Sequence, residues 1–300
     1  MLFYLDNWLS VSPNAAPPTA ANMRRRGLNE NYAREIMELH TLGVDGGYTQ
    51  RDVREVARCF TGWTLIRPSG QAEFRFAARL HDRGEKTVLG TRIEAGRGIE
   101  DGLKVIDLLA RHPATARFIA TKLVRRVVAD DPPAALVDRV ADSFRRTDGD
   151  IPSLIRTIVE APEFYAPEAY RAKVKKPLEF VAGALRLTQA ETRVTPQILR
   201  YLGRMGEPLH LAQPPTGYPD VGAAWISPDT LLTRINFASE LIANRLEGAR
   251  VDTAALGDFR TFIRLIAPDS LSAATRAALA ESEGPEALAL LLAAPEFQRR

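Results

Sequence analysis

The chain has 300 residues, of which 45% are hydrophobic and 26% charged, and its formal charge is +3. This composition is that of a globular protein with a full core, and it excludes a disordered or fibrous chain. The single cysteine excludes an intramolecular disulfide framework and a multi-cysteine zinc site. No apolar run approaches the roughly 18 residues of a membrane span. The charge excess is too small to indicate a nucleic-acid partner.

Helical spacing of apolar residues runs through most of the chain. Asn29 can cap a helix over residues 30–42, which Gly43 ends, and Thr49 can cap the next one, which runs to Gly62. After Gly98 the pattern predicts further helices over 99–111, 113–129, 133–146, 151–161, 175–188, 195–205, 228–246, 258–266, 271–282 and 285–294. The expected fold class is therefore mainly α.

Strand character is confined to short segments near residues 63–90. Residues 63–66 and 87–90 are apolar, and residues 73–76 alternate with period two. They predict a small antiparallel β element. Residues 10–27 are rich in proline and alanine and predict an exposed loop, whereas residues 207–226 predict a structured Pro/Gly-rich loop. We expect one multi-helical domain over residues 1–300.

Ionisable side chains crowd the predicted helix over 30–42. Glu30, Arg34 and Glu38 recur at every fourth position, so the arginine can pair with both carboxylates. Glu35 lies beside them, and His40 lies toward the apolar side. Such a cluster can bind a cation or work as acid and base, but a salt-bridged helix face is the commoner arrangement. The Glu-x-x-His spacing of di-iron helices is absent from this helix, where Glu35-x-x-Glu38 and Glu38-x-His40 occur instead.

The pair His81-Asp82 is the second candidate site, in a predicted loop with Gly84 and Lys86 close by. A histidine beside an aspartate can be a metal ligand or a general base. The alternative is a turn whose side chains bind nearby backbone. The catalytic candidates are therefore Glu35, His81 and Asp82. One divalent metal would take its ligands from Glu35, Glu38, His40, His81 and Asp82.

The basic stretch that ends at Lys176 precedes a predicted helix with Glu179 in its first turn. It can hold an anionic group, although a solvated basic loop is commoner. The sequence has no Gly-x-Ser-x-Gly elbow, no phosphate-binding P-loop and no strand-linked Gly-x-Gly-x-x-Gly. Cys59 lies inside an apolar helical pattern, which indicates an inert core thiol rather than a nucleophile.

Ordered blocks of residues recur along nearly the whole chain. They are residues 29–43, Tyr48-Thr49-x-x-Asp52-Val53, Thr61-Gly62-Trp63, His81-Asp82-x-Gly84-x-Lys86-x-x-Leu89-Gly90, His112-Pro113-x-Thr115-Ala116, Lys173-x-Lys175-x-Pro177-Leu178-Glu179-Phe180, Pro214-Pro215-x-Gly217-Tyr218-Pro219, Trp225, and Asn236-Phe237-Ala238. This series resembles a bacterial family catalogued as domain of unknown function 1800.

The resemblance implies a protein of a family without an established activity. Members are often exported and are often encoded beside a second family that resembles alkaline phosphatases and sulfatases. They usually carry a further helical block before the segment seen here at Tyr4-Leu5-Asp6, so we expect this chain to be the C-terminal part of a longer member. No signal peptide is predicted at its start, and the sequence assigns no compartment.

These observations leave three functions open. The first is a non-enzymatic accessory or binding protein of the bacterial envelope or exterior, acting with a phosphatase- or sulfatase-like partner. The second is a metal-dependent hydrolase that uses the Glu/His/Asp cluster, which requires the 30–42 helix and the 81–86 loop to meet. The third is a structural component of the envelope. We favour the first, because no motif reaches catalytic specificity.

Overall fold

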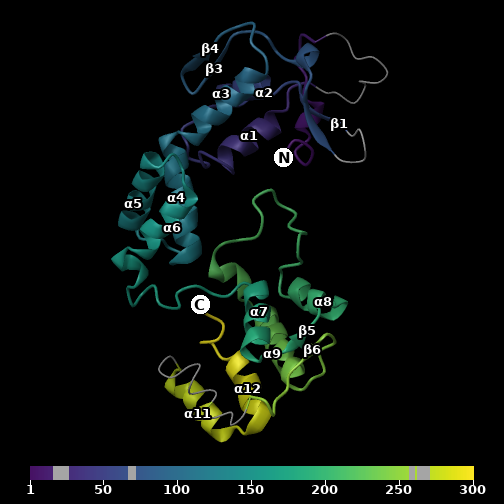
Figure 1. The fold of residues 1–300 in the computed structure, drawn as a ribbon, viewed down its shortest axis with the longest axis vertical. Coiled ribbons are helices and arrows are strands. Elements are labelled where there is room, and N and C mark those ends of the chain that lie inside the picture. Colours follow the sequence, from purple (N-terminus) through teal and green to yellow (C-terminus); the bar gives the residue numbers. More distant parts are fainter. Residues whose placement is uncertain (16–26, 67–71, 257–260, 262–270) are drawn as a thin grey trace. The chain divides into compact units, whose positions relative to one another are not determined.

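The computed structural model describes residues 1–15, 27–66, 72–256, 261 and 271–300, and its fold is mainly α-helical (Figure 1). The chain divides into two compact units. The N-unit comprises Met1–Leu123 and Ala134–Ile158, and the C-unit comprises Val124–Pro133 and Val159–Arg300. The sequence pattern predicts a single helical domain, whereas the structure has two units, each with a hydrophobic core of its own.

The N-unit combines helices with two β-hairpins. Its helices are η1 (Asn7–Leu9), α1 (Glu30–Glu38), α2 (Gln50–Cys59), η3 (Ala78–Leu80), α3 (Ile99–Ala110), most of α4 (Pro113–Val127), α5 (Ala134–Arg146) and nearly all of α6 (Ile151–Val159). Strand β1 (Trp63–Ile66) pairs antiparallel with β2 (Glu73–Phe76), and β3 (Lys86–Val88) pairs antiparallel with β4 (Thr91–Ile93).

The predicted β element is therefore two separate hairpins. The apolar run over 87–90 does not form one strand, because Leu89 and Gly90 have φ angles of 48° and 76° and turn the chain into β4. A two-residue hairpin turn needs left-handed backbone at both positions, which glycine supplies at no steric cost.

The helix predicted over 30–42 ends earlier, at Glu38. The amides of Leu42 and Gly43 both donate to the carbonyl oxygen of Met37, and Gly43 has a φ of 85°. This left-handed glycine closes the helix end. His40 consequently lies beyond the helix and is exposed.

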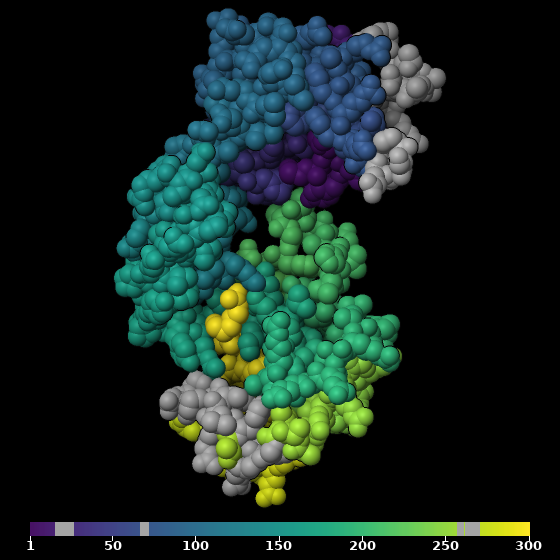
Figure 2. Space-filling view, viewed as in Figure 1, coloured from purple at the N-terminus to yellow at the C-terminus, as the bar shows by residue number. Residues whose placement is uncertain are grey.

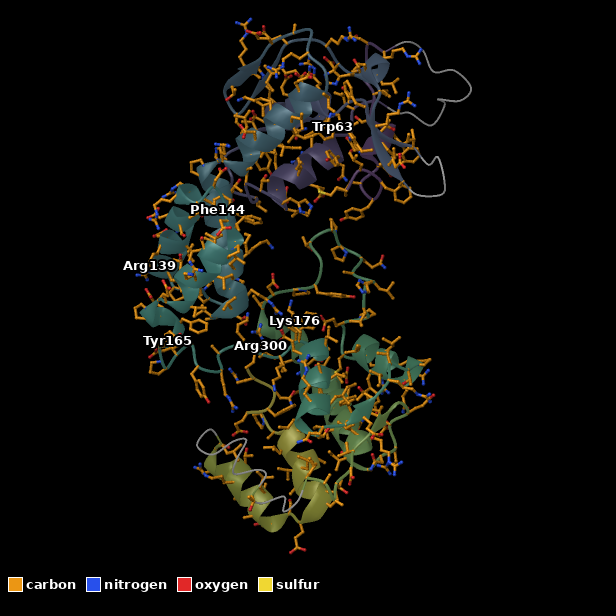
Figure 3. All side chains as sticks on the ribbon, in the orientation of Figure 1. Trp63, Arg139, Phe144, Tyr165, Lys176 and Arg300 are labelled. Carbon is orange, nitrogen blue, oxygen red and sulfur yellow. The ribbon has the colours of Figure 1, made fainter. Side chains whose placement is uncertain are left out.

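Aromatic rings organise the core of the N-unit. Phe60 packs edge-on against both Tyr32 and Trp63, with ring centroids 5.2 and 5.1 Å apart. The Trp63 indole, labelled in Figure 3, lies against Gly102 of α3, where an added Cβ would come within 2.5 Å of the ring. The bare backbone of Gly102 therefore makes room for the tryptophan.

The C-unit packs its helices around a second core. They are η4 (Pro162–Phe164), α7 (Pro177–Leu187), α8 (Pro196–Arg204), η5 (Gly222–Trp225), α9 (Pro228–Ile242), α11 (Ala273–Glu281) and α12 (Gly284–Ala293). Strands β5 (Glu191–Thr192) and β6 (Ala249–Arg250) form a short antiparallel pair. Apart from residue 261, the helix predicted over 258–266 lies outside the described residues.

The predicted exposed loop over 10–27 also lies largely outside the described residues. In its described part, Ser10 and Ser12 are buried, and the amide of Ser12 donates to the carbonyl oxygen of Leu80 over 2.8 Å. The start of this segment is therefore held by the N-unit.

The last residues of the chain lie beside the segment that precedes α7, as the yellow atoms in Figure 2 show. Arg300 N donates to Lys173 O over 2.9 Å, and Lys175 N donates to Gln298 O over 2.8 Å. Arg234 of α9 fixes both strands of this pair. It is fully buried and donates to the Gln298 side chain and to Lys175 O over 2.9 and 2.8 Å.

Candidate functional site

A polar stripe on α2 positions the hairpin of β3 and the loop before it. Asp52 accepts a hydrogen bond from the amide of Leu89 over 2.7 Å, and Glu55 accepts one from the amide of Thr87 over 3.1 Å. Arg58, three residues further along the helix, binds Asp82. Residues three apart lie on one helix face, so a single face of α2 holds the whole segment.

The Asp82 carboxylate is held by a two-pronged contact with the Arg58 guanidinium. Arg58 Nη2 and Nε lie 2.9 and 3.2 Å from Asp82 Oδ1 and Oδ2. The amide of Gly84 also donates to Oδ1 over 2.9 Å. Burial acts to raise the pKa of Asp82, but these donors outweigh it and leave the pKa below its usual value. Asp82 is therefore a paired anion.

His81 and Lys86 converge on Asp101, a residue of α3 that no sequence motif identifies. His81 Nε2 lies 3.2 Å from Asp101 Oδ2, and Lys86 Nζ lies 2.7 Å from the same oxygen. His81 Nδ1 lies 2.9 Å from Thr61 O. Both ring nitrogens thus face acceptors. Both ring nitrogens are therefore engaged in contacts within the N-unit.

The second oxygen of Asp101 is less well satisfied. Arg97 Nε lies 3.4 Å from Oδ1, close enough for an ion pair, yet the geometry gives no hydrogen bond and the atom is buried. Burial acts to raise the pKa of Asp101, but the hydrogen bonds from His81 and Lys86 lower it below its usual value. The cluster is an internal charge network, closed by α3.

The candidates on α1 contact the other end of α2. Glu30 accepts from Gln50 Nε2 over 2.7 Å and pairs with Arg54 over 3.3 Å. Arg34 donates to the Gln50 side chain over 2.5 Å. The expected pairing of this arginine with the carboxylates of its own helix is not among the described contacts, because the amide of Gln50 lies within reach.

Glu38 and Glu35 differ in their surroundings. Glu38 accepts a hydrogen bond from the Tyr48 hydroxyl over 3.1 Å. Glu35 Oε2 is buried and has no hydrogen-bond partner among the described residues. No described hydrogen bond or ion pair joins α1 to the 81–86 loop. Across the described ranges, no group of three or more His, Cys, Asp or Glu side chains could hold a metal ion.

Lys176 and Glu179 lie in a second network, in the C-unit. Lys176 Nζ lies 3.0 Å from Asp220 Oδ1, and Glu179 Oε2 accepts from the Lys176 amide over 2.9 Å, which caps α7. Glu179 also pairs with Arg126 and Arg300 over 2.6 and 3.0 Å. Figure 3 labels Lys176 and Arg300 in this region. The basic stretch is thus paired rather than solvated.

The Pro/Gly-rich loop over 207–226 is anchored by the same network. Lys173 pairs with Asp130 and donates to Asp220 O over 2.8 Å, and the amide of Gly222 donates to Asp130 Oδ2 over 2.6 Å. Glu207 accepts from the amide of Leu178 over 2.8 Å. These contacts explain why a segment so rich in proline and glycine has a defined path.

Lys175 and Arg234 of the C-unit rest on neighbouring aromatic rings. Lys175 Nζ lies 3.6 Å from the centroid of the Phe297 ring, and the Arg234 guanidinium lies 5.1 Å from that of Phe180. The two rings are themselves in edge contact. Burial, assisted by the charge of Arg171, lowers the pKa of Lys175 to about 8. Burial likewise raises the pKa of the Cys59 thiol to about 12, which agrees with an inert core cysteine.

Arg58, Asp101 and Arg234 are further residues of these networks that the sequence motifs do not identify. The spacing Asp52-x-x-Glu55-x-x-Arg58 is a readable signal, since it places two carboxylates and one guanidinium on one helix face. Asp101 and Arg234 carried no such signal, because each lies in an ordinary helix and is recognised only from its buried partners.

Residues 1–299 match the family described as "Protein of unknown function (DUF1800)". The chain belongs to this family. No curated protein and no solved structure matches it. In the described part of this DUF1800 chain, no helix is both long and apolar enough to cross a membrane.

Proposed function

We propose that this chain is a non-enzymatic accessory or binding protein of the bacterial envelope or exterior that acts with a phosphatase- or sulfatase-like partner. The observation that carries the proposal is the closed pairing of His81, Asp82 and Lys86. A general base or nucleophile must reach the proton or atom on which it acts. These side chains are buried and are bound to Thr61, Arg58 and Asp101 instead.

The pairing gives the motif His81-Asp82-x-Gly84-x-Lys86 a structural role. It ties the loop before β3 to α2 and α3, so these residue types are needed for the fold of the N-unit. A binding protein also needs exposed groups that a partner can cover. Tyr165 and Tyr170, each 70% exposed, are such groups in the C-unit. The kind of partner follows from the family resemblance.

The test combines the purified chain with a phosphatase-like protein of the kind often encoded beside members of this family. We expect the chain alone to hydrolyse neither 4-nitrophenyl phosphate nor 4-nitrophenyl sulfate, and the mixture to sediment as a complex. Hydrolysis by the chain alone contradicts the proposal. If no complex forms at concentrations of tens of micromolar, the proposed partnership with a phosphatase-like protein is wrong.

Elemental analysis of untagged chain, purified without chelators, separates the proposal from a metal-dependent hydrolase. About one equivalent of metal that is lost in Glu35→Ala, with the fold retained by circular dichroism, would favour the hydrolase. Glu35 is the residue to vary because its buried carboxylate oxygen has no described partner. Homo-oligomers that bind no partner would favour a structural component.

A further inference from the structure

The six lysines of the sequence all lie within the described residues, and five of them have ordinary surroundings. Three bind carboxylates: Lys86, Lys173 and Lys176. Two are exposed: Lys104 and Lys122. The sixth, Lys175, is half-buried, yet its Nζ has no hydrogen bond or ion pair with any described residue. Figure 3 labels its neighbour Lys176.

The Lys175 amine lies between an aromatic ring and the backbone of α7. Its Nζ is 3.6 Å from the centroid of the Phe297 ring and 3.7 Å from the point where a Cβ on Gly183 would lie. A ring face attracts an ammonium group but accepts its protons poorly compared with an oxygen atom. The surroundings of Lys175 thus remove water from the amine without offering it an oxygen acceptor.

These surroundings favour the neutral amine. Burial, assisted by the charges of Arg171 and Arg234, lowers the pKa of Lys175 to about 8. About a quarter of the Lys175 amines are then unprotonated at pH 7.5, compared with about one in a thousand for an ordinary lysine. An unprotonated amine has a free lone pair and is a nucleophile. Lys175 is therefore the lysine side chain of this chain best suited to attack an electrophile.

Arg234 is a second desolvated cation close to Lys175. It is fully buried, and it donates to two uncharged groups, the Gln298 side chain and Lys175 O. Its Nε has no hydrogen-bond partner, and no carboxylate forms an ion pair with it among the described residues. A buried guanidinium without a counter-ion is costly. An anion formed at Lys175 would lower this cost.

Glu179 is the described carboxylate whose charge acts on Lys175 in the opposite direction. It already pairs with Arg126 and Arg300 over 2.6 and 3.0 Å. Its negative charge is therefore balanced by two guanidinium groups, and the field of Arg234 is left to act on Lys175.

We propose that Lys175 binds carbon dioxide as a carbamate, in the positive field of Arg234. The lone pair of Nζ forms a bond to the carbon of CO2, one C–O π bond becomes a lone pair on oxygen, and Nζ loses a proton to water. An acyl group would give a neutral product and leave Arg234 without an anion, whereas the carbamate supplies one. The site is independent of the phosphatase-like partner.

Trapping of the carbamate locates it in the full chain. Bicarbonate at pH 7.5 supplies CO2, triethyloxonium converts carbamates to ethyl esters, and peptide mass spectrometry assigns the esters. We expect Lys175 to be trapped at least about tenfold more than Lys104 or Lys122, because more of its amine is neutral. No ester on Lys175, or equal amounts on the exposed lysines, would overturn the proposal.

The 13C NMR signal of carbamate, from labelled bicarbonate, measures occupancy without trapping. Lys175→Met should abolish the signal of the side-chain carbamate. The matched control is Lys122→Met, which removes another amine over a ring, 5.3 Å from the Phe118 centroid, but an exposed one. It should leave the spectrum unchanged. Any signal from the α-amino group of Met1 persists in both variants. A spectrum unchanged by Lys175→Met, with the fold retained by circular dichroism, would place the carbamate elsewhere and refute the inference.

Two further variants test the part played by charge. Arg234→Gln should lower the occupancy of the Lys175 carbamate by about threefold, and Glu179→Gln should raise it by a similar factor, because the two charges have opposite signs. If Arg234→Gln does not fold, Glu179→Gln still tests the effect, since a glutamine keeps an acceptor oxygen for the Lys176 amide. An unchanged or lower occupancy in Glu179→Gln would contradict an anion at this position.

Discussion

Lys86 Nζ lies 2.7 Å from Asp101 Oδ2, and both side chains are removed from solvent. The ammonium group also donates to the carbonyl oxygens of Asp82 and Gly84 over 2.5 and 2.9 Å. Three acceptors thus match its three N–H donors. Asp101 belongs to α3 and Lys86 to β3, so the pair joins two elements of the N-unit.

Lys86→Met is expected to lower the free energy of unfolding by about 3–5 kcal/mol, because it leaves the Asp101 carboxylate buried without its nearest cation. Urea unfolding followed by circular dichroism measures the change. The double variant Lys86→Met with Asp101→Leu removes both charges. It should lose less than the sum of the two single variants. Additive losses would show that the two residues are not coupled.

The paired aspartates make the free energy of unfolding depend on pH in the acidic range. The pKa values of Asp82 and Asp101 lie below the usual 3.8 in the folded chain, despite a burial effect that opposes this. Their stabilising contribution is therefore complete above about pH 4 and is lost as the pH falls through the folded-state pKa.

The free energy of unfolding of the native chain should accordingly fall more steeply below about pH 4 than that of Asp82→Asn. Asp82→Asn should also be less stable at pH 7, since its amide cannot receive both Arg58 donors as a carboxylate does. Parallel curves for the two proteins would contradict this account. The measurement is a series of urea unfolding curves at fixed ionic strength.

Helix positions were predictable wherever cap residues and apolar spacing agree, as at Asn29 and Thr49. Asn29 accepts from the amide of Tyr32, and Thr49 forms the expected capping box with Asp52. The sequence pattern predicts the end of α1 too late. The turn that closes the helix runs from Met37 to Gly43, and the apolar residues within it still recur with helical spacing.

The candidate site residues show more clearly what the sequence alone does not predict. The sequence identifies His81 and Asp82 as unusual, but it does not reveal that they bind Asp101 and Arg58. Such partners are set by tertiary packing between α2, α3 and the loop before β3. The spacing of Asp52, Glu55 and Arg58 indicates a charged face of α2, but it does not identify what that face binds. The same is true of Arg234, which is identified only by its burial beneath Gln298 and Lys175.

Gly102→Ala should destabilise the N-unit even though alanine is the better helix former. Alanine in a helix interior usually gains about 1 kcal/mol over glycine. Here the new Cβ would lie 2.5 Å from the Trp63 ring, and overpacking of this kind costs about 1–3 kcal/mol. We therefore expect a net loss of stability in urea unfolding.

Gly203→Ala in α8 is the matched control. The nearest atom to its added Cβ is 3.9 Å away, which is ordinary contact, so this variant should be unchanged or more stable. If Gly102→Ala and Gly203→Ala behave alike, the fit of Trp63 against α3 does not limit stability.

Lys175 should titrate near neutrality. Its pKa is lowered to about 8, chiefly by burial and then by the charge of Arg171, whereas the unfolded side chain has a pKa of about 10.5. Between these values the unfolded chain binds more protons than the folded one. The free energy of unfolding should therefore rise with pH from about 8 to about 10.5. Lys175→Met should remove this rise, and a persisting rise would assign it to another group.

The Asp130 carboxylate bridges two segments of the C-unit, so its loss is expected to loosen the Pro/Gly-rich loop. It pairs with Lys173 and accepts from the amide of Gly222, which lies in η5 at the end of the Pro/Gly-rich loop. Asp130→Asn removes the negative charge that binds Lys173. It also replaces one of the two acceptor oxygens of the carboxylate with an NH2 group. The Gly222 amide should then exchange its hydrogen at least about tenfold faster, as expected when a local opening becomes easier by about 1.4 kcal/mol. Hydrogen exchange read by mass spectrometry over residues 213–226 measures this.

The matched control is Asp131→Asn, which changes an exposed neighbour and should leave the exchange rate of the Gly222 amide unchanged. Equal rates in the two variants would mean that the loop is held by Lys176 and Glu207 without Asp130.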